Sequence, residues 1–157
     1  MASWLPLLSD ILPMILPSTT EVIRRARAPA HEPKARGGGG GGSVEHHAVV
    51  GRCDKMCASV LTTRPHSASP IRHNSEHDAI IYAVSGTCTL IVKEGFRGDL
   101  RRHRLGPGDF AFVPAWTEHQ ASNESDEEVV WLITQSGPRP VGAVLTDWGG
   151  DEVRAHS

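Results

Sequence analysis

The stretch that most constrains the fold is residues 106–123, GPGDFAFVPAWTEHQASN. Pro107 and Gly108 favour a tight turn, because proline presets its own φ and glycine tolerates a positive φ. Residues 110–113 follow as a short apolar run, which is typical of a packed strand. Pro114 ends that strand, since proline cannot donate to a central ladder. The stretch therefore predicts a turn, a strand, a second turn and a second strand.

The rest of the chain after the glycine run at residues 37–42 also has the pattern of short strands separated by turns. Short segments rich in β-branched residues alternate with Gly, Pro, Ser, Asn and Asp. We expect strands at residues 47–50, 56–62, 80–84, 88–92, 119–121, 128–134 and 141–145. Because no segment beyond the first few dozen residues carries a 3.6-residue apolar stripe, the pattern predicts an all-β, single-domain antiparallel barrel or sandwich.

The domain limits follow from the same pattern. At 157 residues the chain has room for one domain with one core. We expect an N-terminal extension and glycine-rich linker at residues 1–43, the β domain at 44–150 and a tail at 151–157. A content of 39% hydrophobic and 22% charged residues is typical of a soluble globular protein.

Charge and the N-terminus bear on partners and compartment. The formal net charge is −2 and no basic tract stands out, which argues against nucleic acid as a partner. The apolar residues 1–17 are too short and too often interrupted by proline to predict a membrane span. No Lys or Arg precedes them, so we expect a cytoplasmic protein, with a secretion signal as the minor alternative. The three cysteines, Cys53, Cys57 and Cys88, are expected to be buried small hydrophobes.

Four residues within 106–123 resemble the second motif of the cupin superfamily. Gly108, Pro114, His119 and Asn123 fall at the spacing of that motif, whereas Trp116 stands where the family has a glycine. The resemblance implies a cupin barrel, a double-stranded β-helix of jelly-roll type. It also implies that His119 lies on the inner face of the barrel, where the family's histidine is a metal ligand.

The first cupin motif is matched less well. Counting back from the glycine that ends it, Gly86, the family's His, His and Glu positions fall on Arg72, Asn74 and Ala79. Small stand-alone cupins of bacteria and fungi look like His-His-His-Gly-Glu-x-Asp at this point. Against that pattern the chain keeps three residues, His73, Glu76 and Asp78. The resemblance covers about residues 44–150.

Two alternatives remain open for the site. If a bulge turns His73 and His77 inward, they and His119 would supply three nitrogens for a divalent metal ion, Fe, Mn, Ni or Zn. In the second alternative Arg72 occupies that space with a fixed positive charge, and the pocket works without a metal ion. A buried guanidinium would disfavour both a cation and a protonated imidazole nearby.

The resemblance implies a function as well as a fold. The leading hypothesis is a cupin-type oxidoreductase acting on an apolar or aromatic small molecule, similar to accessory cupins of fungal natural-product pathways such as polyketide synthesis. In it, Glu76 or Asp78 transfers the proton. The second hypothesis is a metal-free cyclase, isomerase or dehydratase, with His119 as the base and Arg72 stabilising an enolate or carboxylate. The third is a non-catalytic binding module.

Aromatic residues and sheet edges suggest further contacts. Trp116, next to the turn that precedes His119, is the first candidate for a pocket wall on which a flat substrate could stack. The other aromatic candidates for substrate binding are Tyr82, Phe112 and Trp131. We also expect a homodimer, because small barrels expose sheet edges, and residues 19–27 could pair with a partner's edge strand.

Overall fold

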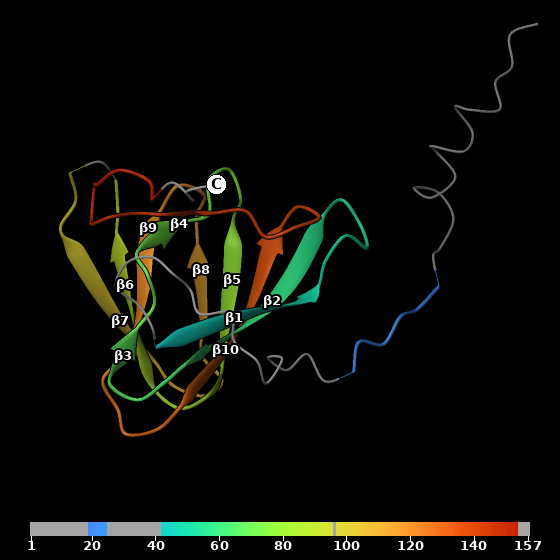
Figure 1. Ribbon diagram of the computed structural model, residues 1–157, viewed down its shortest axis with the longest axis horizontal. Helices are drawn as coiled ribbons and strands as arrows, with labels where there is room; N and C mark the ends of the chain where they lie inside the picture. The colour runs from blue at the N-terminus through green and yellow to red at the C-terminus, as the bar shows by residue number, and fades with distance from the viewer. Residues whose placement is uncertain (1–18, 25–41, 96, 154–157) are drawn as a thin grey trace, which may run out of the picture.

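The computed structural model describes residues 19–24, 42–95 and 97–153 (Figure 1). Within these residues all regular secondary structure is β. The strands, in chain order, are β1 (Ser43–Val49), β2 (Met56–Thr63), β3 (Ser67–Ala68), β4 (Arg72–His73), β5 (Ala79–Ser85), β6 (Cys88–Lys93), β7 (Leu100–Leu105), β8 (Phe110–Val113), β9 (Glu118–Asn123), β10 (Val129–Ser136) and β11 (Ala143–Val144). The predicted all-β fold class is confirmed.

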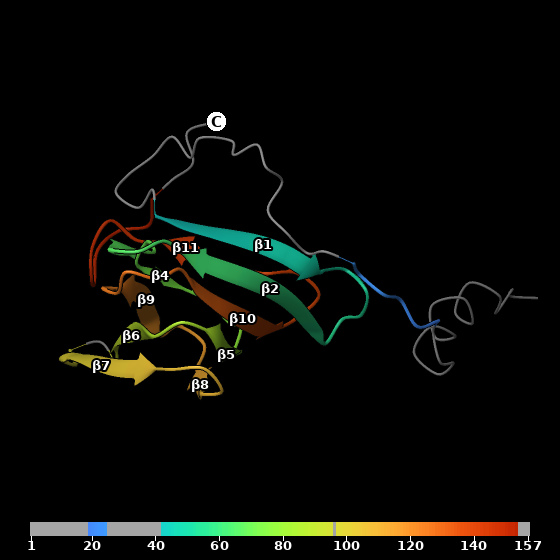
Figure 2. The same cartoon turned by 90° about the horizontal axis from the view of Figure 1, so that it is seen from below.

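The strands form two antiparallel sheets. Sheet 1 has the order β1-β2-β10-β5-β8, and sheet 2 has the order β11-β4-β9-β6-β7, with β3 paired to β9. Both orders can be followed from top to bottom in Figure 2. Neighbouring strands are mostly far apart in the sequence, as in β10 beside β2 and β9 beside β4. Two such facing antiparallel sheets are the architecture of a jelly-roll-like barrel.

The core lies between the sheets because side chains alternate along each strand. In β2, for example, every second residue from Cys57 to Thr63 is buried, and the residues between them are half-buried. The core takes side chains from both sheets, including Leu61, Ile81, Ala83, Leu90, Val92, Leu105, Val113 and Trp131.

The stretch at residues 106–123 forms the turn, β8, second turn and β9 that its sequence predicts. Gly108 has a φ of 93°, in the left-handed region that favours glycine. Asn123, at the end of β9, is 1% exposed, and its side chain connects the end of β2 to the loop that follows β9. Its amide nitrogen donates to the carbonyl oxygens of Thr63, Arg64 and Glu127, and its oxygen accepts from the backbone N–H and the hydroxyl of Ser125.

Three strands were not predicted as such from the sequence. β3 and β4 are two residues long and carry no periodicity that a sequence window would show. The segment LRRHRL, which forms β7, has exposed side chains at all its positions except Leu105. β7 is an edge strand, and charged side chains on an edge oppose pairing with another molecule.

The described part of the N-terminal region is residues 19–24, which form no strand. Glu21 forms an ion pair of 3.0 Å with Arg52 in the loop between β1 and β2. Residues 25–27 and all but the last glycine of the run at 37–42 lie outside the described residues, so the predicted linker and strand pairing there stay predictions. Among the described residues no helix is long and apolar enough to cross a membrane.

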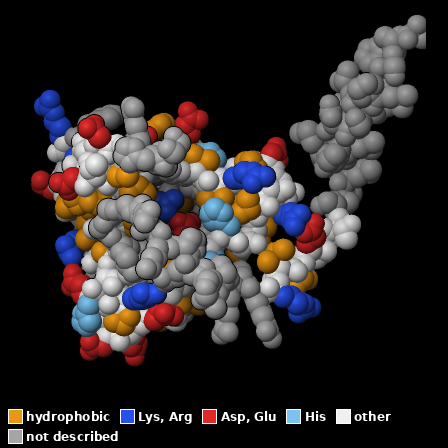
Figure 3. Space-filling model, in the orientation of Figure 1, with side chains coloured by type: hydrophobic (Ala, Val, Ile, Leu, Met, Phe, Trp, Pro, Cys, Tyr) orange, Lys and Arg blue, Asp and Glu red, His pale blue; other side chains and the backbone are white. Residues whose placement is uncertain are grey.

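The described surface mixes charges of both signs. On the face seen in Figure 3, acidic and basic side chains are interspersed with hydrophobic ones. The expectation for the cysteines is right for Cys57 and Cys88, which are buried, and wrong for Cys53, which is exposed in the loop before β2. Burial raises the pKa of the Cys57 thiol and raises that of Cys88 to about 11, so neither thiol is ionised near neutral pH.

Candidate functional site

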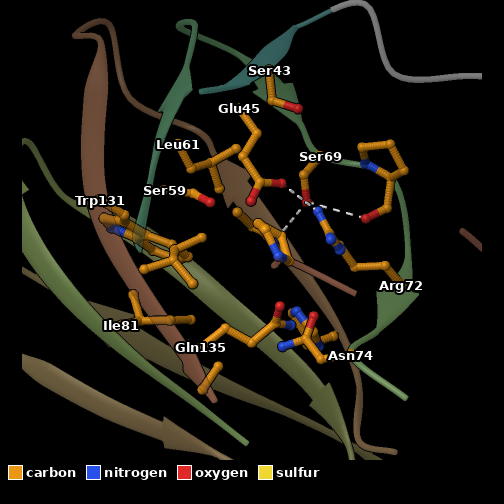
Figure 4. Close-up of a pocket in the computed structure, with 16 residues that line it drawn as sticks. Ser43, Glu45, Ser59, Leu61, Ser69, Arg72, Asn74, Ile81, Trp131 and Gln135 are labelled. Carbon is orange, nitrogen blue, oxygen red and sulfur yellow. Dashed lines mark hydrogen bonds and ion pairs between the residues drawn. The ribbon is translucent and has the colours of Figure 1, made fainter. Parts of the chain in front are cut away.

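A cavity of about 200 Å³ lies among side chains from both sheets, and we call it the central pocket. Its apolar wall consists of Leu61, Ala79, Ile81, Ala121, Trp131 and Ile133. The polar side chains include Glu45 from β1, Arg72 from β4, His119 from β9 and Gln135 from β10. Figure 4 shows Glu45 and Arg72 reaching toward each other, with Leu61, Ile81 and Trp131 across from Arg72.

Arg72 is the charged group at the centre of this arrangement. Its Nη1 donates to Oε2 of Glu45 at 2.6 Å, and the two side chains are only 26% and 20% exposed. The Nε atom of Arg72 is buried and has no hydrogen-bond partner among the described residues, and the same holds for Nε1 of Trp131. Buried donors without a partner are rare in folded proteins, so two of them on residues of one pocket suggest a site built to receive acceptor atoms.

His119 lies beside Arg72 because the two residues are direct partners across the β4–β9 pair. Direct partners share one face of a sheet, so both side chains belong to the pocket. Nδ1–H of His119 donates to the carbonyl oxygen of Thr117 at 2.9 Å. The proton of the neutral ring therefore sits on Nδ1, and Nε2 keeps its lone pair.

Burial is the main cause that lowers the pKa of His119 from 6.5 to about 4, and the positive charge of Arg72 lowers it further. The hydrogen bond to Thr117 and the carboxylate of Glu45 act in the opposite direction but do not offset burial. His119 is therefore a neutral imidazole, with an available lone pair, throughout the physiological pH range.

The segment after β10 closes one side of the pocket. The amide of Gln135 donates to the carbonyl oxygen of Val141 at 2.9 Å and accepts from its N–H at 2.8 Å. Pro140 lines the pocket next to this clamp. At Gly142 a Cβ atom would lie 2.9 Å from Nη2 of Arg72 and 3.0 Å from the carbonyl oxygen of His73, so a larger residue there would require the guanidinium to shift.

His73 lies on the other face of β4, away from His119. Its Nδ1 accepts the N–H of Ser75 at 3.0 Å, its Nε2 is 3.6 Å from Oε1 of Glu152, and its ring lies 5.2 Å from that of Trp116. Ser75 and Trp116 both have a positive φ, 50° and 63°, and the N–H of Trp116 donates to the carbonyl oxygen of Ser75. Trp116 thus adopts the backbone conformation for which the family motif has glycine, and 60% of it is exposed.

His77, Glu76 and Asp78 do not line the pocket either. Nδ1 of His77 contacts the carbonyl oxygen of Ser136, and the ring packs close to Gly137. Oδ1 of Asp78 accepts the N–H of Ala115 at 2.9 Å, which holds the turn after β8. Glu76 is exposed in the loop after β4. The expectation that Glu76 or Asp78 reaches the reacting group is therefore not supported by where these side chains lie.

Of the four aromatic candidates, the structure brings only Trp131 into the pocket with His119. Tyr82 lies on the opposite face of sheet 1, with its ring 4.7 Å from that of Phe110. Phe112 is on the same strand as Phe110 and is 64% exposed. Trp116 does not line the central pocket, because its ring lies against that of His73, on the other face of β4.

The residues of the pocket do not fit a bound divalent metal ion. The predicted ligands His73, His77 and His119 are not brought together, and no group of three or more His, Cys, Asp or Glu side chains that could hold a metal ion occurs among the described residues. In the pocket itself the ligand types are His119 and Glu45, and the carboxylate of Glu45 already accepts from Arg72. A cation would lie next to a guanidinium and be repelled by it. The residues that line the central pocket therefore lack a ligand set for a divalent metal ion.

Sequence reasoning missed two residues of the pocket, Glu45 and Gln135. Glu45 lies 27 positions before Arg72, and no local spacing connects the two. The strand expected at residues 47–50 begins after Glu45, whereas β1 begins at Ser43, so the sequence pattern did not place Glu45 on the inner face of a strand. Gln135 follows the predicted strand at 128–134, and its role depends on the return of the chain at Val141.

The comparisons with known proteins bear on the fold. Residues 59–134 match the Cupin domain family. A comparison with curated proteins finds no match. Among solved structures, the chain is similar to an oxalate oxidase, with a TM-score of 0.58, 12% identity, and coverage of 64% of this chain and 54% of the other.

Two other structures are similar in the same way. Oxalate decarboxylase from Bacillus subtilis gives a TM-score of 0.62 and 19% identity over 69% of this chain and 29% of that one. Peruvianin-I, described as a cysteine peptidase from Thevetia peruviana latex, gives a TM-score of 0.63 and 16% identity over 76% of this chain and 72% of that one. The chain thus spans about half or less of the oxalate-converting proteins. At these identities the likeness concerns the fold alone, and the names differ in activity. Together with the match over residues 59–134, it shows that this chain has the cupin fold.

Proposed function

We propose that the protein is a metal-independent enzyme that moves a proton on a small carbonyl compound with an apolar or aromatic part. Isomerases, cyclases and dehydratases perform reactions of this class. The observation that carries the proposal is the pairing of the Arg72 guanidinium with the neutral imidazole of His119, on one face of β4 and β9, in a largely apolar pocket.

His119 is the proposed base. Its Nδ1–H is committed to Thr117, so the lone pair on Nε2 is the one available to a substrate. In the proposed step the C–H bond next to a carbonyl breaks, the proton passes to Nε2, and the electron pair moves onto the carbonyl oxygen as an enolate. Return of the proton at another carbon completes an isomerisation, and loss of a β-hydroxyl as water completes a dehydration.

Arg72 is the proposed stabiliser of the enolate. Its guanidinium is held in place by Glu45, so little reorganisation is needed when the negative charge develops. The same negative charge favours the imidazolium form of His119, which offsets the low pKa of that residue in the free pocket. In this respect the substrate itself makes His119 a stronger base.

The size and lining of the pocket limit the substrate. About 200 Å³ is smaller than the roughly 300–1,000 Å³ of sites for drug-sized ligands, which favours a compact molecule. Leu61, Ile81 and Trp131 provide an apolar wall opposite Arg72, where a ring or alkyl group would pack. A small aryl ketone has both a carbonyl oxygen that can face Arg72 and a ring that can pack on the apolar wall.

The other two hypotheses have less support from the pocket. An oxidoreductase that works through a metal ion needs a ligand set that the described residues do not supply. A part in polyketide or other natural-product synthesis stays a prediction from the family resemblance. A non-catalytic binding module would use the same apolar wall, and it differs from the proposal only in showing no turnover.

The test is exchange of the α-hydrogens of phenylacetone with deuterium from the solvent, followed by NMR with and without the protein. Wild type should accelerate exchange, and Arg72→Met and His119→Ala should each reduce that acceleration about 100-fold or more. Glu76→Gln, an exposed carboxylate outside the pocket, is the matched control and should behave as wild type. Exchange that persists in His119→Ala would refute the assignment, and saturable binding without exchange would favour the binding module.

A further inference from the structure

Asn74 is a polar residue of the central pocket that the proposed proton transfer does not use. It follows β4 directly, two residues after Arg72, and lines the same cavity. Asn74 is only 4% exposed, and its side-chain amide forms no hydrogen bond with any described residue. Burying an amide without a partner is costly, so a buried amide that faces a cavity is expected to bind a polar group of a ligand.

The backbone around Asn74 is held on both sides. The carbonyl oxygen of Asn74 accepts the N–H of His77 at 3.0 Å. The next residue, Ser75, has a φ of 50°. Its N–H donates to Nδ1 of His73, and its carbonyl oxygen accepts the N–H of Trp116. Because the backbone is already fixed, little conformational entropy is lost when the amide of Asn74 binds a ligand.

Two other polar side chains of the pocket differ from Asn74. Both polar atoms of the Gln135 amide are occupied, because they bond to the backbone of Val141. The hydroxyl of Ser59 has no hydrogen-bond partner among the described residues either. Ser59, however, is the cross-strand partner of Ile133, so it belongs to the apolar wall on sheet 1.

Arg72 and Asn74 are placed to bind two oxygens of one small molecule. Residues two apart in an extended chain share a face, and their Cα atoms are about 6.6 Å apart. Figure 4 shows both side chains on the same side of the pocket, with Ile81 and Trp131 across from them. A compact molecule that contacts both must therefore carry its two oxygens on nearby carbons.

A β-hydroxy ketone has two oxygens arranged in this way. Its carbonyl oxygen would face Arg72, and its hydroxyl is on the next carbon but one. The carbon between them keeps the hydrogen that His119 removes. An α-hydroxyl, by contrast, would occupy that carbon and lie closer to the carbonyl oxygen.

We propose, on the basis of the proton transfer proposed above, that the substrate is a β-hydroxy ketone and that Asn74 binds its hydroxyl group. The reaction is then a dehydration. His119 takes the α-proton at Nε2, and the enolate forms beside Arg72. The carbon–oxygen bond of the hydroxyl breaks, the proton on Nε2 passes to the leaving oxygen, and the electron pair of the enolate forms a carbon–carbon double bond. The products are an unsaturated ketone and water, and His119 is neutral again. The amide N–H of Asn74 donates to the leaving oxygen and stabilises it as the bond breaks.

The first experiment compares the binding of two ketones that differ only in the hydroxyl, 4-hydroxy-4-phenylbutan-2-one and 4-phenylbutan-2-one. Both are titrated by ligand-observed NMR in the His119→Ala background, in which the hydroxy ketone does not react. This protein should bind the hydroxy ketone about tenfold more tightly. Adding Asn74→Leu should abolish the preference by weakening binding of the hydroxy ketone alone, because leucine is close in size but forms no hydrogen bond. Retained affinity for 4-phenylbutan-2-one shows that the pocket is still folded.

Ser59→Ala is the matched control, because it removes the other unpaired polar group of the pocket. It should keep the preference. Equal affinity for the two ketones in the His119→Ala background would overturn the role of Asn74. Loss of the preference in Ser59→Ala instead of Asn74→Leu would overturn it as well.

The second experiment follows formation of the conjugated ketone by its ultraviolet absorbance with His119 present. Wild type and Glu76→Gln should form it, and Asn74→Leu should form it at least tenfold more slowly. Wild type that exchanges the α-hydrogens of 4-phenylbutan-2-one but forms no conjugated ketone would overturn the dehydration and leave the proton transfer standing. Wild type that does neither would refute the proton transfer, while the binding preference would still assign the hydroxyl to Asn74.

Discussion

The ion pair between Glu45 and Arg72 should contribute measurably to the free energy of unfolding, because both of its side chains are largely shielded from water. The two charged atoms lie 2.6 Å apart, and the side chains are 26% and 20% exposed. Unit charges about 4 Å apart attract by roughly 1 kcal/mol in water and by about 4 kcal/mol at an effective dielectric constant of 20. Since part of this is lost to desolvation, we predict a coupling of about 1–3 kcal/mol.

The assay is a double-mutant cycle in urea. Wild type, Glu45→Gln, Arg72→Met and the double variant are unfolded, and the free energies of unfolding are compared. Each single variant leaves one partially buried charge without its counter-charge. The double variant should therefore lose less free energy of unfolding than the sum of the losses of the two single variants. Glutamine keeps an acceptor for Arg72, which isolates the effect of the charge.

The matched control is the pair of Arg102 and Glu124, which has a similar distance of 3.0 Å but side chains that are 58% and 74% exposed. Exposed pairs couple weakly because water and salt screen them. A Glu45–Arg72 coupling no larger than that of the control pair would refute the reasoning, because the pocket would then be as well solvated as the surface.

Three further predictions concern single residues. His119 has a pKa of about 4 in the folded protein and 6.5 when unfolded, so its contribution to stability is complete above pH 6.5 and is lost as the pH falls toward 4. The loss is on the order of 3 kcal/mol. The variant His119→Gln should flatten this pH dependence of the urea midpoint. Asn123→Ala should cost about 3 kcal/mol in urea unfolding, since it leaves several buried backbone groups unpaired, and a loss below about 1 kcal/mol would contradict that role. Gly142→Ala should displace Arg72 at a cost of about 1–3 kcal/mol, whereas equal stability and unchanged deuterium exchange would show that the segment yields freely.

The second motif could be predicted from the sequence because its residues act locally. Turn residues such as Gly108 and Pro114 set the limits of β8, and the spacing to His119 placed that residue on the next strand of the chain. These turns could be predicted because glycine and proline are favoured in particular backbone conformations. Trp116 shows the limit of that reasoning, because it adopts a positive φ without being glycine.

The rest of the site depends on which face of a strand each residue occupies. Side chains alternate along a strand, and in agreement with this Arg72 and Asn74 line the central pocket whereas His73 does not. The alternative with inward His73 and His77 required a bulge. Instead, the turn at Ser75 keeps the buried side chain of His73 and the half-buried side chain of His77 out of the central pocket. Glu45 could not be predicted, because its contact with Arg72 is made between strands of different sheets.

The proposed function requires that Arg72, rather than a metal ion, is the positive charge beside His119. The most direct test is elemental analysis by mass spectrometry of protein purified without a metal-affinity column. We expect far less than one Fe, Mn, Ni or Zn ion per chain, and no rise in melting temperature when any of these ions is added. About one metal ion per chain that is lost in His119→Ala would contradict it.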